Sequence, residues 1–416
     1  MSGGEDFFMK NKTKNKRRGK WTKPRHKVVR AILGFFFLPY VKARYGIKIR
    51  KFRDEKKRPY LILYNHQTAF DQFFVGGAFR QPIYYVATED IFSMGFVSKL
   101  IKFLVEPIPI KKQTNDARAV INCIKVAKEG GTIAIAPEGN RTYSGRTVFI
   151  KPSITALARH LGLPIAFFKI EGGYGVHPRW SDSVRRGGMT AGVSRVVESE
   201  EYKELSDDEL YELICSELWV DENVDDREFI TKAPAEYLER AIYVCDECGL
   251  STFESRGDVI SCKKCSKSWR YTKKKQLAGV GFESRFGYVG DWYDYQESFV
   301  NSLALCDIPD LPLYEEEAEL YEVILYNRKN LIHKNAKIDL YPTRLKISSP
   351  DLSLDLSNDD ITAMAVLGKN KLNVYSGGKV YQFKGDSRFC ALKYVNLFYR
   401  YKNLKKGEEN AEFLGL

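Results

Sequence analysis

Residues 64–73 have the sequence Tyr64-Asn65-His66-Gln67-Thr68-Ala69-Phe70-Asp71-Gln72-Phe73. They follow an apolar run at 60–63 that is bounded by Pro59 and predicts a short buried strand. Residues 70–79 carry enough apolar side chains to form the buried side of a helix. We therefore expect His66 in the turn after a strand and Asp71 in the first turn of the following helix.

The pairing of His66 with Asp71 depends on that turn. On one continuous helix, five positions would place the two side chains well over a quarter-turn apart. In a strand-turn-helix unit they can meet, and a carboxylate beside one imidazole nitrogen leaves the other nitrogen free to accept a proton. The alternative is a structural histidine with an ordinary acid in the first turn of a helix.

A second polar segment follows another predicted strand. Residues 132–136 are apolar, and the chain then continues as Pro137-Glu138-Gly139-Asn140-Arg141-Thr142. Ligand sites in α/β folds occur where such strands end. The two segments together favour an active site over a structural histidine.

These residues resemble the glycerolipid acyltransferase family, which includes lysophosphatidic acid acyltransferase. Its Asn-His-four-residues-Asp motif is matched by Asn65, His66 and Asp71. Its Phe-Pro-Glu-Gly-Thr-Arg-Ser motif is matched at Pro137, Glu138, Gly139 and Arg141, with departures at Ala136, Asn140 and Thr142. An apolar strand near 108–112 resembles the second motif, with Lys112 where the family usually has Arg, and 163–168 resembles the fourth. The resemblance covers roughly 60–173.

The resemblance implies a role for each matched residue. His66 would act as the general base and Asp71 would orient it. Arg141, with Lys112 as a helper, would hold the acceptor phosphate through charge-assisted hydrogen bonds. Glu138 and Gly139 would shape the loop that presents Arg141. Lys112 keeps the positive charge but not the bidentate geometry of Arg, which leaves the acceptor headgroup open.

The basic charge lies in the N-terminal segment. The chain has a net charge of +13, whereas residues 1–58 hold 20 Lys and Arg against four Asp and Glu. The apolar run at 31–41, with three consecutive Phe, has cations on both sides. This pattern favours interfacial attachment to an anionic membrane, although a buried N-terminal helix is the alternative. No run approaches the ~20 apolar residues that span a bilayer.

Four of the eight cysteines form two Cys-x-x-Cys pairs, at Cys245 and Cys248 and at Cys262 and Cys265. The two pairs are separated by thirteen residues, 249–261, which predicts a zinc ribbon with four thiolate ligands and a structural Zn²⁺. Because the other four cysteines are scattered singly, we expect a reducing cytoplasm.

The expected fold class is α/β: an acyltransferase α/β sandwich, a zinc ribbon, and a small antiparallel β domain with a C-terminal helix. Short apolar runs alternate with helical segments up to 197, and strands with hairpin signals follow 317. The expected boundaries are a basic disordered arm at 1–27, a membrane-associated acyltransferase domain at 28–240, the ribbon at 241–275, a connecting segment at 276–311, and a β domain at 312–405 that resembles the pleckstrin-homology-like fold.

The predicted reaction is acyl transfer from a thioester of coenzyme A or acyl carrier protein to a lysophospholipid, with 1-acyl-glycerol-3-phosphate giving phosphatidic acid. The protein would act at the cytoplasmic face of the cell membrane as a peripheral or monotopic enzyme. Alternatives are a glycerol-3-phosphate acyltransferase and a non-catalytic lipid-binding scaffold. Nucleic-acid binding by the basic arm ranks last, because an apolar anchor adjoins the cations.

Overall fold

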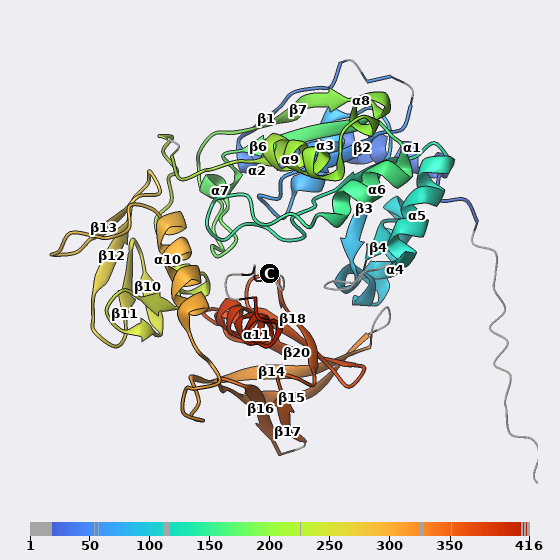
Figure 1. Cartoon of the computed structure of the whole chain (residues 1–416). Helices are drawn as coiled ribbons and strands as arrows, with labels where there is room; N and C mark the ends of the chain where they lie inside the picture. Colours follow the sequence, from blue (N-terminus) through green and yellow to red (C-terminus); the bar gives the residue numbers. More distant parts are fainter. Residues whose placement is uncertain are drawn as a thin grey trace, which may run out of the picture.

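The computed structural model describes residues 19–53, 55–56, 58–110, 117–224, 226–324, 328–350, 352–408, 411 and 413. Within these residues the chain forms a mixed α/β domain, a small antiparallel ribbon, and an antiparallel β domain with a helix at its C-terminal end (Figure 1). The predicted fold class is therefore confirmed.

The α/β domain is built on one seven-stranded sheet within the described residues. Neighbouring strands pair in the parallel direction, except that β6 and β7 pair with each other antiparallel. β2, which leads into His66, lies between β5 and β6 and is buried along its whole length. In sheet order the strands are β1 (Ile47–Ile49), β7 (Met189–Val197), β6 (Ile165–Glu171), β2 (Leu61–Tyr64), β5 (Thr132–Ile135), β3 (Ile83–Thr88) and β4 (Ile108–Ile110).

Helices cover both faces of this sheet (Figure 1). On one face, α2 (Leu38–Tyr45) and α3 (Asp71–Ala78) bury apolar side chains such as Val41 and Phe74. On the other, α5 (Ala117–Lys128), α6 (Ser153–Leu161) and α9 (Asp207–Leu218) bury Val126, Ala158 and Ile214. Burial of apolar area on both faces is the main stabilising contribution to this sandwich. Short elements complete the domain: η2 (Glu89–Ser93), α7 (Gly173–Val176) and α8 (Ser199–Lys203).

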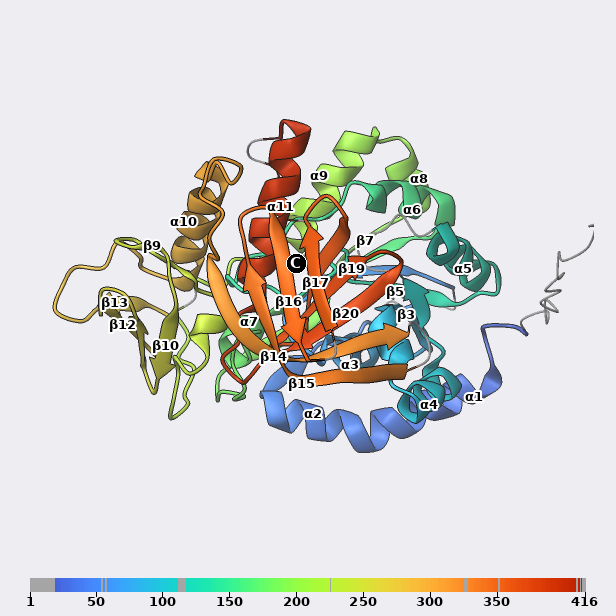
Figure 2. The same cartoon turned by 90° about the horizontal axis from the view of Figure 1, so that it is seen from below.

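The N-terminal helical run lies along one edge of the molecule. It consists of α1 (Pro24–Ile32), a π-helical turn η1 (Leu33–Phe37) and α2. Figure 2 shows α1 beside α4 (Phe96–Val105). The Arg25 guanidinium joins α1 to α4 by donating to the Phe103 carbonyl at 2.9 Å. Since α1 begins at Pro24, the predicted arm at 1–27 is too long at its end; its residues 1–18 lie outside the described part of the chain.

The ribbon begins with a two-stranded pair, β8 (Val244–Cys245) and β9 (Gly249–Leu250), which follows the short helix η3 (Leu238–Arg240). Its four-stranded sheet contains β10 (Phe253–Arg256), β11 (Val259–Cys262), β12 (Ser268–Tyr271) and β13 (Leu277–Gly279). β13 pairs with β12 although it falls after the expected boundary at 275. The segment expected to be a connection at 276–311 also contains the long helix α10 (Val289–Ser302), so it is largely structured.

The C-terminal β domain has a seven-stranded antiparallel sheet within the described residues. Helix α11 (Ala391–Lys406) packs on the sheet, and its residues share one apolar core with α10 and the ribbon. The ribbon and β domain therefore form one packed unit. The strands are β14 (Tyr314–Ile324), β15 (Arg328–Leu340), β16 (Arg344–Ser349), β17 (Leu352–Ser357), β18 (Ile361–Leu367), β19 (Lys371–Ser376) and β20 (Lys379–Lys384).

Candidate active site

Asn65 fixes the turn that follows β2. Its side-chain Nδ2 donates to the Ile170 carbonyl at 2.8 Å, and its Oδ1 accepts from the Ile170 N–H at 2.8 Å. Asn65 thus makes both hydrogen bonds of a strand partner where the ladder between β2 and β6 has ended. The turn that carries His66 is consequently held in place by the neighbouring strand.

His66 and Asp71 form the predicted pair. Nδ1 of His66 lies 2.8 Å from Oδ2 of Asp71. Asp71 is fully buried, whereas the His66 side chain is 25% exposed. The carboxylate also accepts the backbone N–H groups of Gln67 at 2.7 Å and Thr68 at 2.9 Å, and the Thr68 hydroxyl at 2.7 Å. Because the carboxylate accepts from Nδ1, it selects the tautomer in which Nε2 of His66 can take a proton.

Glu138 joins the second polar segment to the histidine turn. Its Oε1 accepts the His66 backbone N–H at 2.7 Å, and its Oε2 accepts the Val148 N–H at 3.0 Å. Burial raises the pKa of Glu138 to about 8, against the effect of these two N–H donors. Both oxygens of Glu138 thus accept hydrogen bonds from the backbone. Gly139 adopts φ +68°, a left-handed conformation in which any other side chain would be strained.

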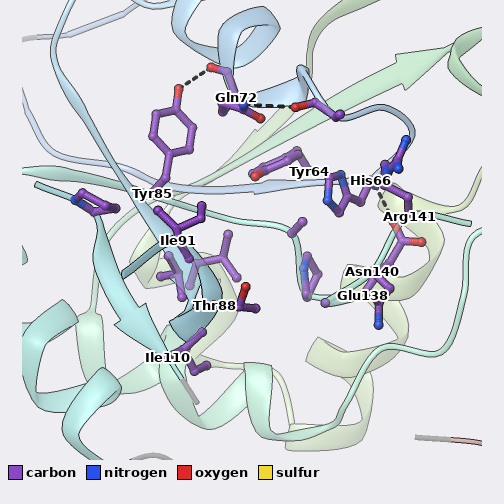
Figure 3. A pocket seen from close by; sticks show the side chains of 18 of the residues that line it. Tyr64, His66, Gln72, Tyr85, Thr88, Ile91, Ile110, Glu138, Asn140 and Arg141 are labelled. Carbon is purple, nitrogen blue, oxygen red and sulfur yellow. Dashed lines mark hydrogen bonds between the residues drawn. The ribbon is translucent and has the colours of Figure 1, made fainter. Parts of the chain in front are cut away.

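Arg141 lies on the same loop, close to His66 (Figure 3). Its NH1 atom is buried and has no hydrogen-bond partner. Burial, followed by the nearby Arg179, lowers the pKa of Arg141 to about 10. A guanidinium that is desolvated and incompletely paired is suited to an anionic ligand. Lys112, the predicted helper, lies outside the described residues.

The loop after β6 supplies a residue that the sequence did not assign. Arg179 is almost fully buried and donates to the Arg141 carbonyl at 2.9 Å and to Oδ1 of Asn140 at 3.2 Å. It therefore supports the loop that carries Arg141. His177 is also buried, its Nδ1 lies 3.1 Å from the Tyr45 hydroxyl, and burial lowers its pKa to about 3. No motif or spacing in the sequence relates either residue to Arg141.

A cavity of about 1260 Å³ adjoins these side chains. His66, Glu138, Gly139 and Arg141 line it, and Asp71 lies behind His66. Figure 3 shows His66, Glu138, Asn140 and Arg141 gathered at one side, with Thr88, Ile91 and Ile110 at another. Much of the remaining wall is apolar and comes from the N-terminal run and α4, including Leu33, Leu38, Ile101 and Leu104. The cavity thus joins a polar, proton-accepting end to a space that suits hydrocarbon.

The four ribbon cysteines gather as predicted. The Sγ atoms of Cys245, Cys248, Cys262 and Cys265 all lie within 4.8 Å of one another. Those of Cys245 and Cys265 are 3.7 Å apart, close to the separation of about 3.8 Å expected around a tetrahedral ion with bonds of about 2.3 Å. Gly249, at φ +65°, makes the turn after the first pair, and a Cβ there would lie 2.8 Å from Phe299. The cluster could bind a metal ion.

Comparison with known proteins supports the family resemblance. The family model described as Acyltransferase matches residues 47–169. The crystal structure of the 1-acyl-sn-glycerophosphate (LPA) acyltransferase PlsC from Thermotoga maritima is similar with a TM-score of 0.39 and 19% identity. The alignment covers 46% of this chain and 76% of that chain. No curated protein matches the chain.

Proposed function

We propose that the protein transfers a fatty acyl group from an acyl thioester to the free hydroxyl of a lysophospholipid, with 1-acyl-glycerol-3-phosphate as the acceptor and phosphatidic acid as the product. The main support for this proposal is that His66 and Asp71 form a hydrogen-bonded pair at the polar end of a cavity that Arg141 also lines. The donor is a thioester of coenzyme A or of acyl carrier protein.

In the proposed step, Nε2 of His66 takes the proton of the acceptor hydroxyl while that oxygen bonds to the thioester carbonyl carbon. Asp71 holds the ring through Nδ1 and stabilises the imidazolium that forms. Collapse of the tetrahedral intermediate breaks the carbon–sulfur bond, and the thiol leaves with the proton returned by His66. The acyl group thus passes directly from the thioester to the acceptor oxygen, and no covalent acyl-enzyme forms.

The thiol in the cavity wall supports direct transfer. Cys123 lines the cavity, but burial raises its pKa to about 12. A thiol with that pKa has almost no thiolate at neutral pH and is a poor nucleophile. Cys123, the cysteine in the described cavity lining, is therefore unsuited to form an acyl-enzyme, which is consistent with direct transfer to the acceptor hydroxyl.

Arg141 is proposed to hold the acceptor phosphate. Its NH1 is buried without a partner at the edge of the cavity that contains His66. The apolar part of the cavity favours an acceptor that carries an acyl chain over glycerol 3-phosphate itself. Steady-state kinetics of Arg141→Ala test the phosphate contact. The KM for 1-acyl-glycerol-3-phosphate should rise at least about tenfold, whereas an unchanged KM would show that Arg141 does not bind the phosphate.

The same helices that line the cavity also expose apolar side chains. Phe35 and Phe36 on the N-terminal run are 73% and 71% exposed, and Phe96 and Phe103 on α4 are 77% and 58% exposed. Residues 24–45 and 96–105 contain no Asp or Glu. Within the described residues, no helix has both the length and the apolar character to cross a bilayer. We propose that this aromatic surface, formed by Phe35, Phe36, Phe96 and Phe103, lies in the headgroup layer of an anionic cytoplasmic membrane.

The cysteine cluster is proposed to hold a structural Zn²⁺. Four thiolates complete a tetrahedral shell and leave no open position for substrate. The ribbon has a small core, so metal binding would contribute directly to its folding. Its residues nevertheless pack into the larger core formed with α10 and the β domain.

A further inference from the structure

We propose that α10 and the turn between β18 and β19 form the acceptor-facing wall of the catalytic cavity and thereby limit the size of the headgroup that it admits. This inference rests on the proposed function, because it concerns the acceptor of the same site. It adds a specificity element that lies outside the matched segment 47–169.

The cavity has a wall contributed by the C-terminal half of the chain. Three of its lining residues lie on α10, three at the end of β18 and the turn after it, and one close to the C-terminus. Figure 1 shows α10 and β18 facing the α/β domain. These lining residues are Tyr293, Asp294 and Glu297, then Val366, Leu367 and Gly368, and finally Phe413.

A first latch ties α10 to the loop that carries Arg141. Arg146, on that loop, donates from Nε to Asp221 at 3.0 Å and from NH2 to Asp291 of α10 at 3.1 Å. Its NH1 donates to Asp294, one turn further along α10. A single guanidinium thus bridges the α/β domain and α10, and it lines the cavity itself. Any outward movement of α10 must break two of these three ion pairs.

A second latch ties the β18–β19 turn to the loop after β6. Lys369, in the turn, donates to Oδ1 of Asp182 at 2.7 Å. Arg240 donates to both oxygens of Asp182, at 2.8 and 3.2 Å. Burial alone would raise the pKa of Asp182, but the hydrogen bonds from Arg240 and Lys369 lower it to about 2. The Asp182 carboxylate of this latch is therefore charged at neutral pH.

The ribbon holds α10 from its other side. Trp292 donates from its indole N–H to the Val244 carbonyl at 2.8 Å. Gln296 accepts the Tyr243 N–H at 2.8 Å and donates to the Ala241 carbonyl at 3.0 Å. Val244 immediately precedes the metal-site residue Cys245. The helix is consequently fixed between the ribbon and the catalytic loop, as a rigid wall requires.

This wall faces the polar end of the cavity. Burial raises the pKa of Tyr293 well above its usual value, and the nearby Arg179 opposes that increase. Arg179 in turn donates to the Arg141 carbonyl at 2.9 Å. Burial lowers the pKa of Lys369, and Arg141 adds to that decrease. Both wall elements therefore lie within electrostatic range of the arginines at the proposed phosphate site, where a headgroup would be.

The test compares two acceptors of different headgroup size, lysophosphatidic acid and lysophosphatidylglycerol, in the same mixed micelles. Lys369→Met removes the lysine of the second latch, and Asp294→Asn removes one of the two ion pairs by which Arg146 holds α10. In each variant we expect the ratio of kcat/KM for the small acceptor to that for the large one to fall about five- to tenfold, and in Lys369→Met kcat for lysophosphatidic acid should stay within about twofold of wild type. Lys369→Arg should retain the wild-type ratio, because it keeps the charge.

The matched control is Lys337→Met, which removes a surface ion pair to Glu315 on the same β domain but away from the cavity. It should leave the ratio unchanged. An unchanged ratio in both latch variants, with transfer intact, would overturn the wall while leaving the proposed function in place.

A binding measurement tests the headgroup-limiting wall independently of the proposed acyl-transfer function. In a His66→Ala background, equilibrium binding of both lysolipids can be measured without turnover. In one outcome, the wild-type protein transfers no acyl group while the latch variants still reduce the binding preference for lysophosphatidic acid. That result would support the headgroup-limiting wall and contradict the proposed acyl-transfer reaction. If binding preference is also unaffected by the latches, the wall is wrong as well.

Discussion

Asp71 receives the Nδ1 hydrogen bond of His66 at 2.8 Å and, with the same carboxylate, the N–H groups of Gln67 and Thr68. The residue that orients the proposed base is thus also the residue that closes the turn before α3. A substitution at Asp71 has two separable consequences, one for the tautomer of His66 and one for the stability of the turn.

Asp71→Asn is expected to lower kcat by roughly 10²–10⁴, because the amide can donate to Nδ1 and so leave the proton on Nε2. Thr68→Val is the matched control, since it removes the 2.7 Å hydroxyl bond to Asp71 and the 3.1 Å bond that the hydroxyl accepts from the Phe70 N–H, but keeps the Asp71 carboxylate beside His66. That control should cost about 1 kcal/mol of unfolding free energy and change kcat little. Steady-state kinetics and denaturant unfolding of both variants measure the two effects. Near-wild-type kcat in Asp71→Asn would contradict an orienting role.

Glu138 predicts a specific pH dependence of stability. Burial raises its pKa from 4.5 to about 8, so the folded state binds a proton that the unfolded state releases between these values. The stabilisation from this proton is complete below about pH 4.5 and is lost as the pH rises through about 8. Glu138→Gln lacks this pH-dependent stabilisation, because its side chain does not titrate in this range. The unfolding free energy of wild type relative to the variant should therefore fall between about pH 5 and about pH 8.5. A constant difference across that range would contradict the raised pKa.

Metal removal tests the ribbon. We expect one Zn²⁺ per chain by elemental analysis and none in Cys248→Ser, with a loss of at least about 3 kcal/mol of unfolding free energy. The buried Trp269 and Trp292, whose rings are 4.4 Å apart, should report the change in near-ultraviolet circular dichroism. Cys306→Ser is the control, because Cys306 is exposed and outside the cluster. Equal metal content in Cys248→Ser and wild type would exclude the four-thiolate site.

The aromatic surface predicts binding to anionic vesicles. Replacement of both Phe35 and Phe36 by Asp should weaken binding by about 10²–10⁴, since burial of each ring in lipid is worth about 1.5–3 kcal/mol. Binding of wild-type protein should also weaken at high salt. Leu311→Asp, at a 67% exposed position in the segment before β14, should bind like wild type. If the control lost as much affinity as the double variant, general charge rather than this surface would be responsible.

Local patterns in the sequence were sufficient for most elements that position the candidate site. The strand expected at 60–63 and the helix expected at 70–79 correspond to β2 and α3 to within one residue at each end, and the turn that joins His66 to Asp71 is present. These features depend on short-range periodicity and turn chemistry. They were therefore accessible without knowledge of the rest of the chain.

Long-range packing was not accessible in that way. The antiparallel pairing of β7 with β6 is a tertiary contact that no local pattern predicts. Helix α10 lies within the segment expected to be a connection at 276–311, and it packs into the apolar core shared with the ribbon. The approach of Arg179 to Arg141 depends on how a loop folds back over the sheet. The cavity wall from α10 has the same origin, since no sequence motif links 293–297 to 136–142.

The most direct measurement is acyl transfer by purified protein in mixed micelles, with wild type beside His66→Ala. An acyl thioester is offered with lysophosphatidic acid, glycerol 3-phosphate and a neutral lysolipid in parallel. The proposed mechanism predicts transfer to lysophosphatidic acid that falls by at least about 10³ in His66→Ala, while lysophosphatidic acid still binds that variant. Near-normal transfer by His66→Ala, or no transfer to any acceptor by folded, metal-loaded wild type, would contradict it.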